Sequence, residues 1–231
     1  MRKMKMLLPV VLGYLLGSIP FAYIAGQLKR RVDIRTVGSR NAGAYNVMLE
    51  VGRLPAIIVV VLDLAKGATP VLLARWLGLS PWIQVGGGMA AVVGHCFPLY
   101  MGLLGLGFRG GMGLAASLGA LVALMPLETL ATLCILGLFF VIFKRVASTT
   151  LVGLGTLALI AWGRGYPLAL ILAPLLFLLL QGLFALPPSI QMWRQAEDRK
   201  DLLLRKWLID PKAHIRTKCS VYHVQIKEEA K

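Results

Sequence analysis

Cysteine is scarce in the sequence, and the cysteines present form no pattern. The 231 residues include three of them, Cys96, Cys134 and Cys219, far apart along the chain. There is no CxxC pair and no Cys/His spacing of the kind that binds zinc, and three scattered cysteines do not indicate a disulfide framework. We therefore expect neither a metal nor another cofactor.

Charged residues are also few, and acidic ones fewest. Only 15% of the residues are charged, with 10 Asp or Glu against 25 Lys or Arg, and the mean hydropathy is +0.75. Such a chain cannot keep most of its surface in water, so lipid must be its solvent. The net charge of +15 suits anionic headgroups or phosphorylated substrates as readily as nucleic acid. Because the basic residues lie between apolar stretches, we expect membrane lipid and no nucleic acid as a partner.

Long apolar runs predict an all-α, polytopic integral membrane protein. A helix needs about 20 apolar residues to cross a bilayer core. The N-terminus resembles a signal peptide but lacks a convincing cleavage site, so it is interpreted as a retained first helix. Pro126 divides one apolar stretch, which leaves five spans as the alternative to about seven. The predicted spans are 6–28, 54–77, 81–103, 113–125, 127–143, 148–163 and 166–186.

The distribution of basic residues predicts the orientation. Of the 25 lysines and arginines, 19 lie in the segments 29–53, 104–112, 144–145 and 187–231. The positive-inside rule places these segments in the cytoplasm and the N-terminus outside, although the basic N-terminal pentapeptide opposes this. The sequence thus predicts a transmembrane domain over 1–186 and a basic cytoplasmic tail over 187–231. Part of the tail is amphipathic and suited to lie on the inner leaflet.

The loop DIRTVGSRNAGAYNV, residues 33–47, has the composition of an anion site. Its glycines permit positive φ, so successive N–H groups can converge on an anion, and its arginines add charge-assisted donors. The alternative is an ordinary positive-inside loop. The candidate residues in this loop are Arg35, Gly38, Ser39, Arg40, Asn41, Gly43 and Asn46.

A second candidate site is GFRGGMG, residues 107–113, directly before an apolar helix. Unpaired N–H groups and the helix dipole favour an anion at such a junction. The segment is neither a Walker sequence nor a dinucleotide fingerprint, and close helix packing through glycine is the alternative. The candidates are Arg109, Gly110, Gly111 and Gly113.

Three ionisable residues lie inside apolar spans. Asp63 and Lys66 are three residues apart, so on a helix they share one face, and His95 lies in the next span. A charge in hydrocarbon is costly enough that such residues usually face a polar cavity or a partner. A structural ion pair, and a histidine bonded to the backbone, are the alternatives.

Familiar catalytic motifs are missing. The sequence has no HxxxxD acyltransferase box, no nucleophile elbow with Ser-His-Asp order, and no paired-carboxylate spacing. An enzyme of this sequence would therefore work by positioning its substrates and by stabilising phosphate and oxyanion charge.

Five segments, taken in order, resemble one family. They are GSIPFAYIAG, DIRTVGSRNAGAYNV, LDLAKGATPVLLARWLGLSPW, VVGHCFPLY and GFRGGMGLAASLGAL. Together they resemble the PlsY-type glycerol-3-phosphate acyltransferases of bacteria, over roughly 9–125 and more loosely to about 205. The resemblance implies a bacterial inner-membrane enzyme with cytoplasmic signature loops. Such an enzyme transfers a fatty acyl group from acyl phosphate to glycerol 3-phosphate, making lysophosphatidic acid for phospholipid synthesis.

The loops and the resemblance together predict the site residues. The predicted catalytic residues are Ser39, Asn41, Lys66 and His95. The predicted substrate-binding residues are Arg35, Gly38, Arg40, Gly43, Asn46, Asp63, Arg109, Gly110, Gly111, Gly113 and Arg194.

The sequence also departs from the family pattern. Arg40, Tyr45, Leu49, Met112, Gln195 and Asp198 stand where the family has glycine, threonine, arginine, lysine, histidine and asparagine. Losing cations from a desolvated phosphate site weakens binding. The alternative hypothesis is therefore a catalytically impaired descendant that binds anionic lipid or acyl phosphate as a regulator or scaffold. The oligomeric state does not follow from the sequence.

Overall fold

The computed structural model describes residues 2–143 and 146–195, and every regular element in these ranges is a helix. The all-α prediction is confirmed for this part of the chain. The helices are α1 (Arg2–Gly17), α2 (Phe21–Arg30), α3 (Ala44–Glu50), α4 (Arg53–Trp76), α5 (Pro81–Cys96), α6 (Leu99–Leu103), α7 (Leu114–Leu124), α8 (Pro126–Phe143), α9 (Val146–Gly163) and α10 (Leu168–Gln195).

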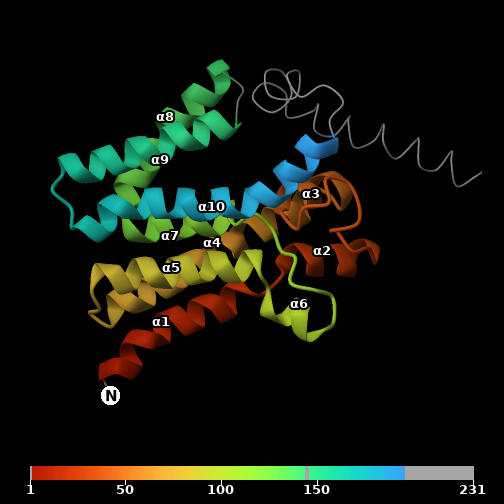
Figure 1. Ribbon diagram of the computed structural model, residues 1–231, viewed down its shortest axis with the longest axis horizontal. Helices are drawn as coiled ribbons and strands as arrows, with labels where there is room; N and C mark the ends of the chain where they lie inside the picture. The colour runs from red at the N-terminus through yellow and green to blue at the C-terminus, as the bar shows by residue number, and fades with distance from the viewer. Residues whose placement is uncertain (1, 144–145, 196–231) are drawn as a thin grey trace, which may run out of the picture.

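The centre of the bundle is built from α4, α5 and α7, with α1 and α10 against them (Figure 1). Small residues allow α4 and α7 to approach closely. A Cβ added at Gly67 would overlap the carbonyl oxygen of Ala116, and one added at Gly119 would overlap that of Leu64. Helix association in lipid depends on such close packing, so these glycines fix the position of α4 beside α7.

Two predicted spans are interrupted, which corrects the sequence prediction. The span 6–28 breaks between Gly17 and Phe21, because Pro20 has no N–H to continue the helix and the Ser18 hydroxyl bonds to the carbonyl of Tyr14 at 2.7 Å. The span 81–103 breaks after Cys96, just before Pro98. Both interruptions lie at the same end of the bundle.

The segment 113–125 is shorter than a span. Its helix, α7, has 11 residues, a length of about 16 Å at 1.5 Å per residue. That is about half of the hydrocarbon thickness of a bilayer. Pro126 begins α8, so the predicted division at this proline is confirmed.

Within residues 2–143 and 146–195, two helical stretches are long and apolar enough to cross a membrane: Met4–Arg30, which includes the break at Pro20, and Arg53–Trp76. The two ends of the bundle differ in chemistry. The turns between α4 and α5 and between α9 and α10 lie at one end, and α2, α3 and α6 lie at the other (Figure 1). Three exposed tryptophans lie beside the α4–α5 and α9–α10 turns: Trp76 (81% exposed), Trp82 (52%) and Trp162 (70%). Exposed tryptophans of this kind are typical of a membrane interface.

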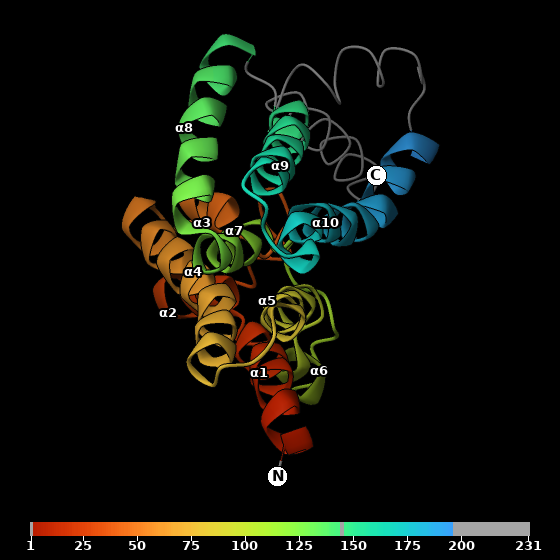
Figure 2. The same cartoon turned by 90° about the vertical axis from the view of Figure 1, so that its left-hand side faces the viewer.

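A polar latch at the tryptophan end joins the corner between α7 and α8 to the turn before α10. The buried carboxylate of Glu128 accepts a hydrogen bond from the Tyr166 hydroxyl at 2.7 Å and lies 3.1 Å from Arg164 Nε. Arg75 donates to the last carbonyl of α7, that of Leu124, at 2.9 Å. These contacts fasten α8 and α9, which stand apart from the central helices in Figure 2.

The predicted domain boundary at 187 lies within a helix. Although Pro187 and Pro188 lie near its end, α10 continues to Gln195. The remainder of the predicted tail, 196–231, lies outside the described residues, and with it Asp198. The division into a membrane domain and a tail stays a prediction.

Candidate phosphate-binding pocket

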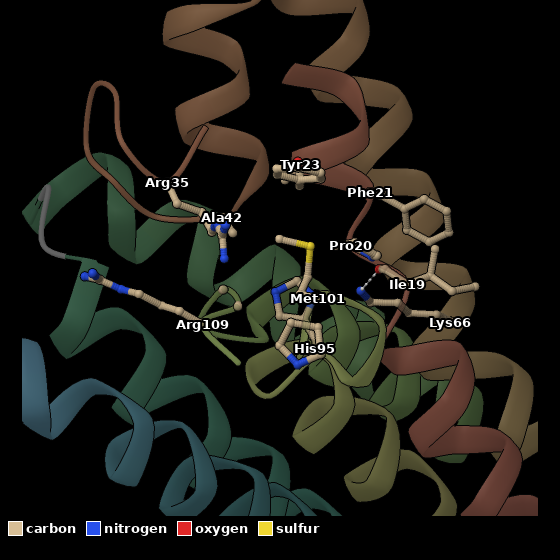
Figure 3. A pocket seen from close by; sticks show the side chains of 14 residues that line it. Ile19, Pro20, Phe21, Tyr23, Arg35, Ala42, Lys66, His95, Met101 and Arg109 are labelled. Carbon is tan, nitrogen blue, oxygen red and sulfur yellow. Dashed lines mark hydrogen bonds between the residues drawn. The ribbon is translucent and has the colours of Figure 1, made fainter. Parts of the chain in front are cut away.

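A small pocket lies at the end of the bundle opposite the exposed tryptophans. It is formed by stretches that are far apart in sequence: the break between α1 and α2, the loop before α3, α4, the end of α5 with α6, and the glycine loop before α7. Figure 3 shows side chains from these stretches around the pocket. The lining residues are Ile19, Pro20, Phe21, Ala22, Tyr23, Arg35, Ala42, Lys66, His95, Pro98, Met101, Arg109, Gly110 and Gly111.

Asp63, Lys66 and His95 form a buried cluster of ionisable side chains, of which Lys66 and His95 line the pocket. Lys66 Nζ lies 2.8 Å from Asp63 Oδ1, and His95 Nδ1 lies 3.6 Å from the same oxygen. All three side chains are nearly excluded from solvent, with 4%, 3% and 8% exposed for Lys66, Asp63 and His95. Lys66 also donates a hydrogen bond to the carbonyl of Ile19 at 3.2 Å, drawn in Figure 3. The intramembrane ion pair proposed from sequence is therefore present, and His95 is its neighbour.

Arg35 reaches the pocket but is held by protein groups. Its Nε and Nη2 donate to the two oxygens of Asp33 at 2.9 and 2.7 Å, and its Nη1 donates to the carbonyl of Leu106 at 2.9 Å. The guanidinium also lies over the ring of Tyr23, 5.5 Å from its centre. Its hydrogen bonds lower the pKa of the Asp33 carboxyl from its usual value. Arg35 therefore joins the loop before α3 to the glycine loop.

The glycine loop caps the end of α5. The N–H of Gly110 donates to the carbonyl of Cys96 at 3.0 Å, and that of Gly111 donates to the carbonyl of His95 at 3.3 Å. A Cβ at Gly111 would overlap His95 Nε2 and press on the carbonyl oxygen of Ala42, so only glycine fits there. These two amides satisfy helix carbonyls and do not point at an anion, unlike the arrangement expected from sequence.

Asn46 organises the loop before α3 from inside. Its Oδ1 accepts the N–H of Ser39 at 2.8 Å, and its Nδ2 donates to the carbonyls of Ile34 and Val37 at 2.7 and 3.1 Å. The residue is 1% exposed, so its amide is fully used within the loop. Its role in substrate binding stays a prediction, and the hydrogen bonds show a structural role within the loop.

Positive φ occurs in the same loop, at Gly38 (55°) and at Arg40 (58°). The glycine fulfils the expectation of a left-handed turn, and the arginine is a less usual occupant of that conformation. Of this loop, only Arg35 and Ala42 line the pocket. The pocket lining does not include their neighbours in sequence Ser39, Asn41 and Gly43.

Arg109 is the exposed cation of the pocket. Among the described residues, its guanidinium has no ion-pair or hydrogen-bond partner, and Figure 3 shows its side chain running away from Lys66 and His95. Gly113 begins α7 with a φ of 77°. Arg194 belongs to the last turn of α10, and its side chain is outside the described part of the structure.

Sequence reasoning missed the wall of the pocket formed by residues 19–23. Ile19 contributes a carbonyl oxygen, Phe21 and Tyr23 contribute rings that face Lys66 and Arg35, and Met101 closes the pocket from α6. The signal available was Pro20, which marks a helix break inside an apolar run.

The donors around the pocket suit a phosphate better than a metal. Most of the lining is apolar, and its charged side chains are those of arginine and lysine. Within residues 2–143 and 146–195 no group of three His, Cys, Asp or Glu side chains is placed to hold a metal ion. Cations in a partly desolvated pocket bind phosphate oxygens through charge-assisted hydrogen bonds.

Comparisons with known proteins agree with this chemistry. A family model described as glycerol-3-phosphate acyltransferase matches residues 7–202. Glycerol-3-phosphate acyltransferase 4 of Dehalococcoides mccartyi is 40% identical over 151 residues, 65% of this chain and 62% of that protein. A glycerol-3-phosphate acyltransferase of Synechococcus is 44% identical over 138 residues, 60% of this chain and 65% of that protein. The matched part of the chain thus spans less than two thirds of the length of either relative.

Solved structures show the same likeness over a longer stretch. The crystal structure of PlsY (YgiH), an integral membrane glycerol 3-phosphate acyltransferase, in its glycerol 3-phosphate form has a TM-score of 0.70 and 29% identity. The match covers 87% of this chain and 99% of that one. The lysophosphatidic acid form of PlsY has a TM-score of 0.69 and 28% identity.

Proposed function

The chain belongs to the glycerol-3-phosphate acyltransferase family, and from this premise we propose that it transfers a fatty acyl group from an acyl phosphate to glycerol 3-phosphate. The product is lysophosphatidic acid, a precursor of membrane phospholipid. The observation that carries the proposal is the single pocket in which Arg35, Lys66, His95, Arg109 and the glycine loop meet.

The reaction needs little covalent chemistry from the protein. The hydroxyl oxygen of glycerol 3-phosphate attacks the carbonyl carbon of the acyl phosphate, and the bond from that carbon to the phosphate oxygen breaks. The hydroxyl proton passes to a substrate phosphate oxygen, and inorganic phosphate leaves. The pocket contributes proximity and a positive potential, with Ser39 orienting a reacting oxygen from the loop beside it.

The placement in the membrane is also proposed. We infer an inner-membrane protein of seven helical units: α1 with α2, α4, α5, α7, α8, α9 and α10. The short α7 does not have to extend to either membrane surface, because neighbouring helices enclose its polar backbone. The basic loops, the pocket and the end of α10 lie together on the cytoplasmic side, which the positive-inside rule supports.

Turnover by the purified protein tests the activity. With acyl phosphate and glycerol 3-phosphate in lipid vesicles, we expect equimolar release of inorganic phosphate and formation of lysophosphatidate. The crystallised PlsY serves as a positive control under the same conditions. Absence of turnover while that control is active would contradict the proposal.

The second candidate is a binding protein without turnover, which acts on lipid synthesis as a regulator or scaffold. It is favoured by Met112, which stands where the family has lysine, and by Arg35, whose guanidinium is already held by protein groups. Complementation separates the two, because only an active enzyme restores growth to a strain that lacks its own acyltransferase.

A further inference from the structure

The helix break that forms one wall of the pocket is contacted by a buried ammonium, that of Lys66. Residues 19–23 of the break all line the pocket, so the position of the break determines the shape of the pocket. Pro20 cannot donate to the carbonyl of Leu16, which is instead reached by the N–H of Ile19 at 3.2 Å. The N–H groups of Ser18, Ile19 and Phe21 still bond to nearby backbone carbonyls, so the contact with Lys66 adds to these local bonds.

The ammonium of Lys66 is surrounded by protein groups. It donates to the carbonyl of Ile19 at 3.2 Å, lies 2.8 Å from Asp63 Oδ1, and lies 5.4 Å from the centre of the Phe21 ring. An ammonium has three N–H groups, so these neighbours can engage much of its hydrogen-bonding capacity. With its side chain only 4% exposed, Lys66 has little opportunity to bind a phosphate.

Asp63 lies beside both Lys66 and His95, although it is too far from His95 Nδ1 for a hydrogen bond. Its Oδ1 is the atom nearest to each, at 2.8 Å from Nζ and 3.6 Å from Nδ1. The other ring nitrogen of His95 faces Gly111, where a Cβ would overlap it. The Asp63 carboxylate thus lies between two parts of the pocket. Lys66 connects it to the carbonyl of Ile19, and His95 lies between it and Gly111 of the glycine loop.

We propose that Asp63 and Lys66 are positioning residues, forming a clasp that fixes the break between α1 and α2 and orients His95. In this arrangement Lys66 does not bind phosphate, which differs from the role expected from sequence. The clasp sets the distance between the two walls of the pocket, and Arg109, which is exposed at the edge, is left to meet the substrate. Only the kinetic part of this inference rests on the proposed function.

Lys66→Met tests the clasp, with Thr69→Ala as the matched control. Thr69 is an exposed residue three positions further along α4, and its hydroxyl bonds only to the carbonyl of Ala65. Amide hydrogen exchange is measured by mass spectrometry on peptides that cover Ser18–Ile24. We expect exchange there to be about tenfold faster in Lys66→Met and unchanged in Thr69→Ala, because local protection depends on the stability of the contacts that close the segment.

Kinetics distinguish positioning from phosphate binding. We expect Lys66→Met to lower kcat by about tenfold or more and to change the KM for glycerol 3-phosphate by less than about threefold. A rise of KM with kcat unchanged would overturn the proposal, and so would unchanged exchange at Ser18–Ile24.

In Lys66→Met the buried carboxylate of Asp63 loses its nearest cation, and an unpaired buried charge destabilises the folded state. The double variant Asp63→Leu/Lys66→Met is therefore measured alongside. It lacks the clasp but has no unpaired buried charge, and we expect the same exchange and kinetic changes in it. An inactive wild type would contradict the proposed function alone, because the exchange measurement does not require turnover.

Discussion

Single residues in this protein act mainly through the backbone groups that they hold. Asn46 bonds to three backbone groups of its loop, Arg35 reaches the carbonyl of Leu106, and Lys66 reaches that of Ile19. A buried polar group that loses such partners destabilises the fold by more than the hydrogen bond itself contributes. Much of the pocket is therefore held by side chains that bond to the backbone, and one of them, Asn46, lies outside the pocket lining.

Asn46→Ala tests this at the loop before α3. The substitution removes three hydrogen bonds and leaves their backbone partners buried, so we expect a loss of about 3 kcal/mol of stability. Thermal unfolding in detergent gives the measurement. Asn41→Ala, in the same loop and partly exposed, should cost less than about 1 kcal/mol. Equal losses in the two variants would show that Asn46 does not organise the loop.

Asp33 gives the loop a predictable response to acid. Its pKa is lowered in the folded protein by the hydrogen bonds from Arg35, so the pair contributes stability above the unfolded carboxyl value of about 3.9. That contribution is lost as the pH falls through the lower, folded-state pKa. We expect wild type to unfold at a higher temperature than Asp33→Asn at neutral pH, with the difference vanishing in acid. A difference that grows on acidification would contradict this.

At the scale of elements, hydropathy located the apolar segments but not their interruptions. The segments assigned to α4, α8 and α9 match the helices closely, because composition along one continuous stretch determines them. The breaks at Pro20 and Pro98 depend on single missing N–H groups within runs that stay apolar. A window that averages hydrophobicity does not register such a change.

For the candidate site, the sequence predicted several of the lining residues but not the groups that hold them in place. Lys66, His95, Arg109, Gly110 and Gly111 were expected from sequence and do line one pocket. The partners of Arg35 and Asn46 were not predictable, because most are backbone groups whose positions depend on the fold. The carbonyl of Leu106, for example, lies 71 positions from Arg35.

The latch between Glu128 and Tyr166 gives a prediction for the outer helices. Tyr166→Phe removes the closest donor to a buried carboxylate, and we expect a loss of about 1 to 2 kcal/mol of stability. Thermal unfolding is compared with that of Tyr45→Phe, the same change at a residue that is 53% exposed. If the two variants unfold at the same temperature, the latch does not fasten α8 and α9.

At the scale of the whole molecule, the bundle has two chemically distinct ends. Exposed tryptophans surround the turns after α4 and after α9, whereas the basic loops and the pocket occupy the other end. This polarity suits a protein that takes a water-soluble phosphorylated acceptor from one side of the membrane and an acyl donor from the lipid. The charge distribution in the sequence predicts that the basic segments face the cytoplasm, and the fold brings these segments together at one end of the bundle.

Binding of glycerol 3-phosphate tests the central claim, that one cationic pocket holds the phosphorylated acceptor, most directly. Isothermal titration of the purified protein is compared for wild type, Arg109→Met and Lys29→Met, the last of which removes an exposed cation at the same end of the bundle but outside the pocket lining. We predict saturable binding that weakens by about tenfold or more in Arg109→Met, as expected for loss of one charge-assisted contact, and by less than about twofold in Lys29→Met. Equal weakening in both variants, or none in either, would contradict the account.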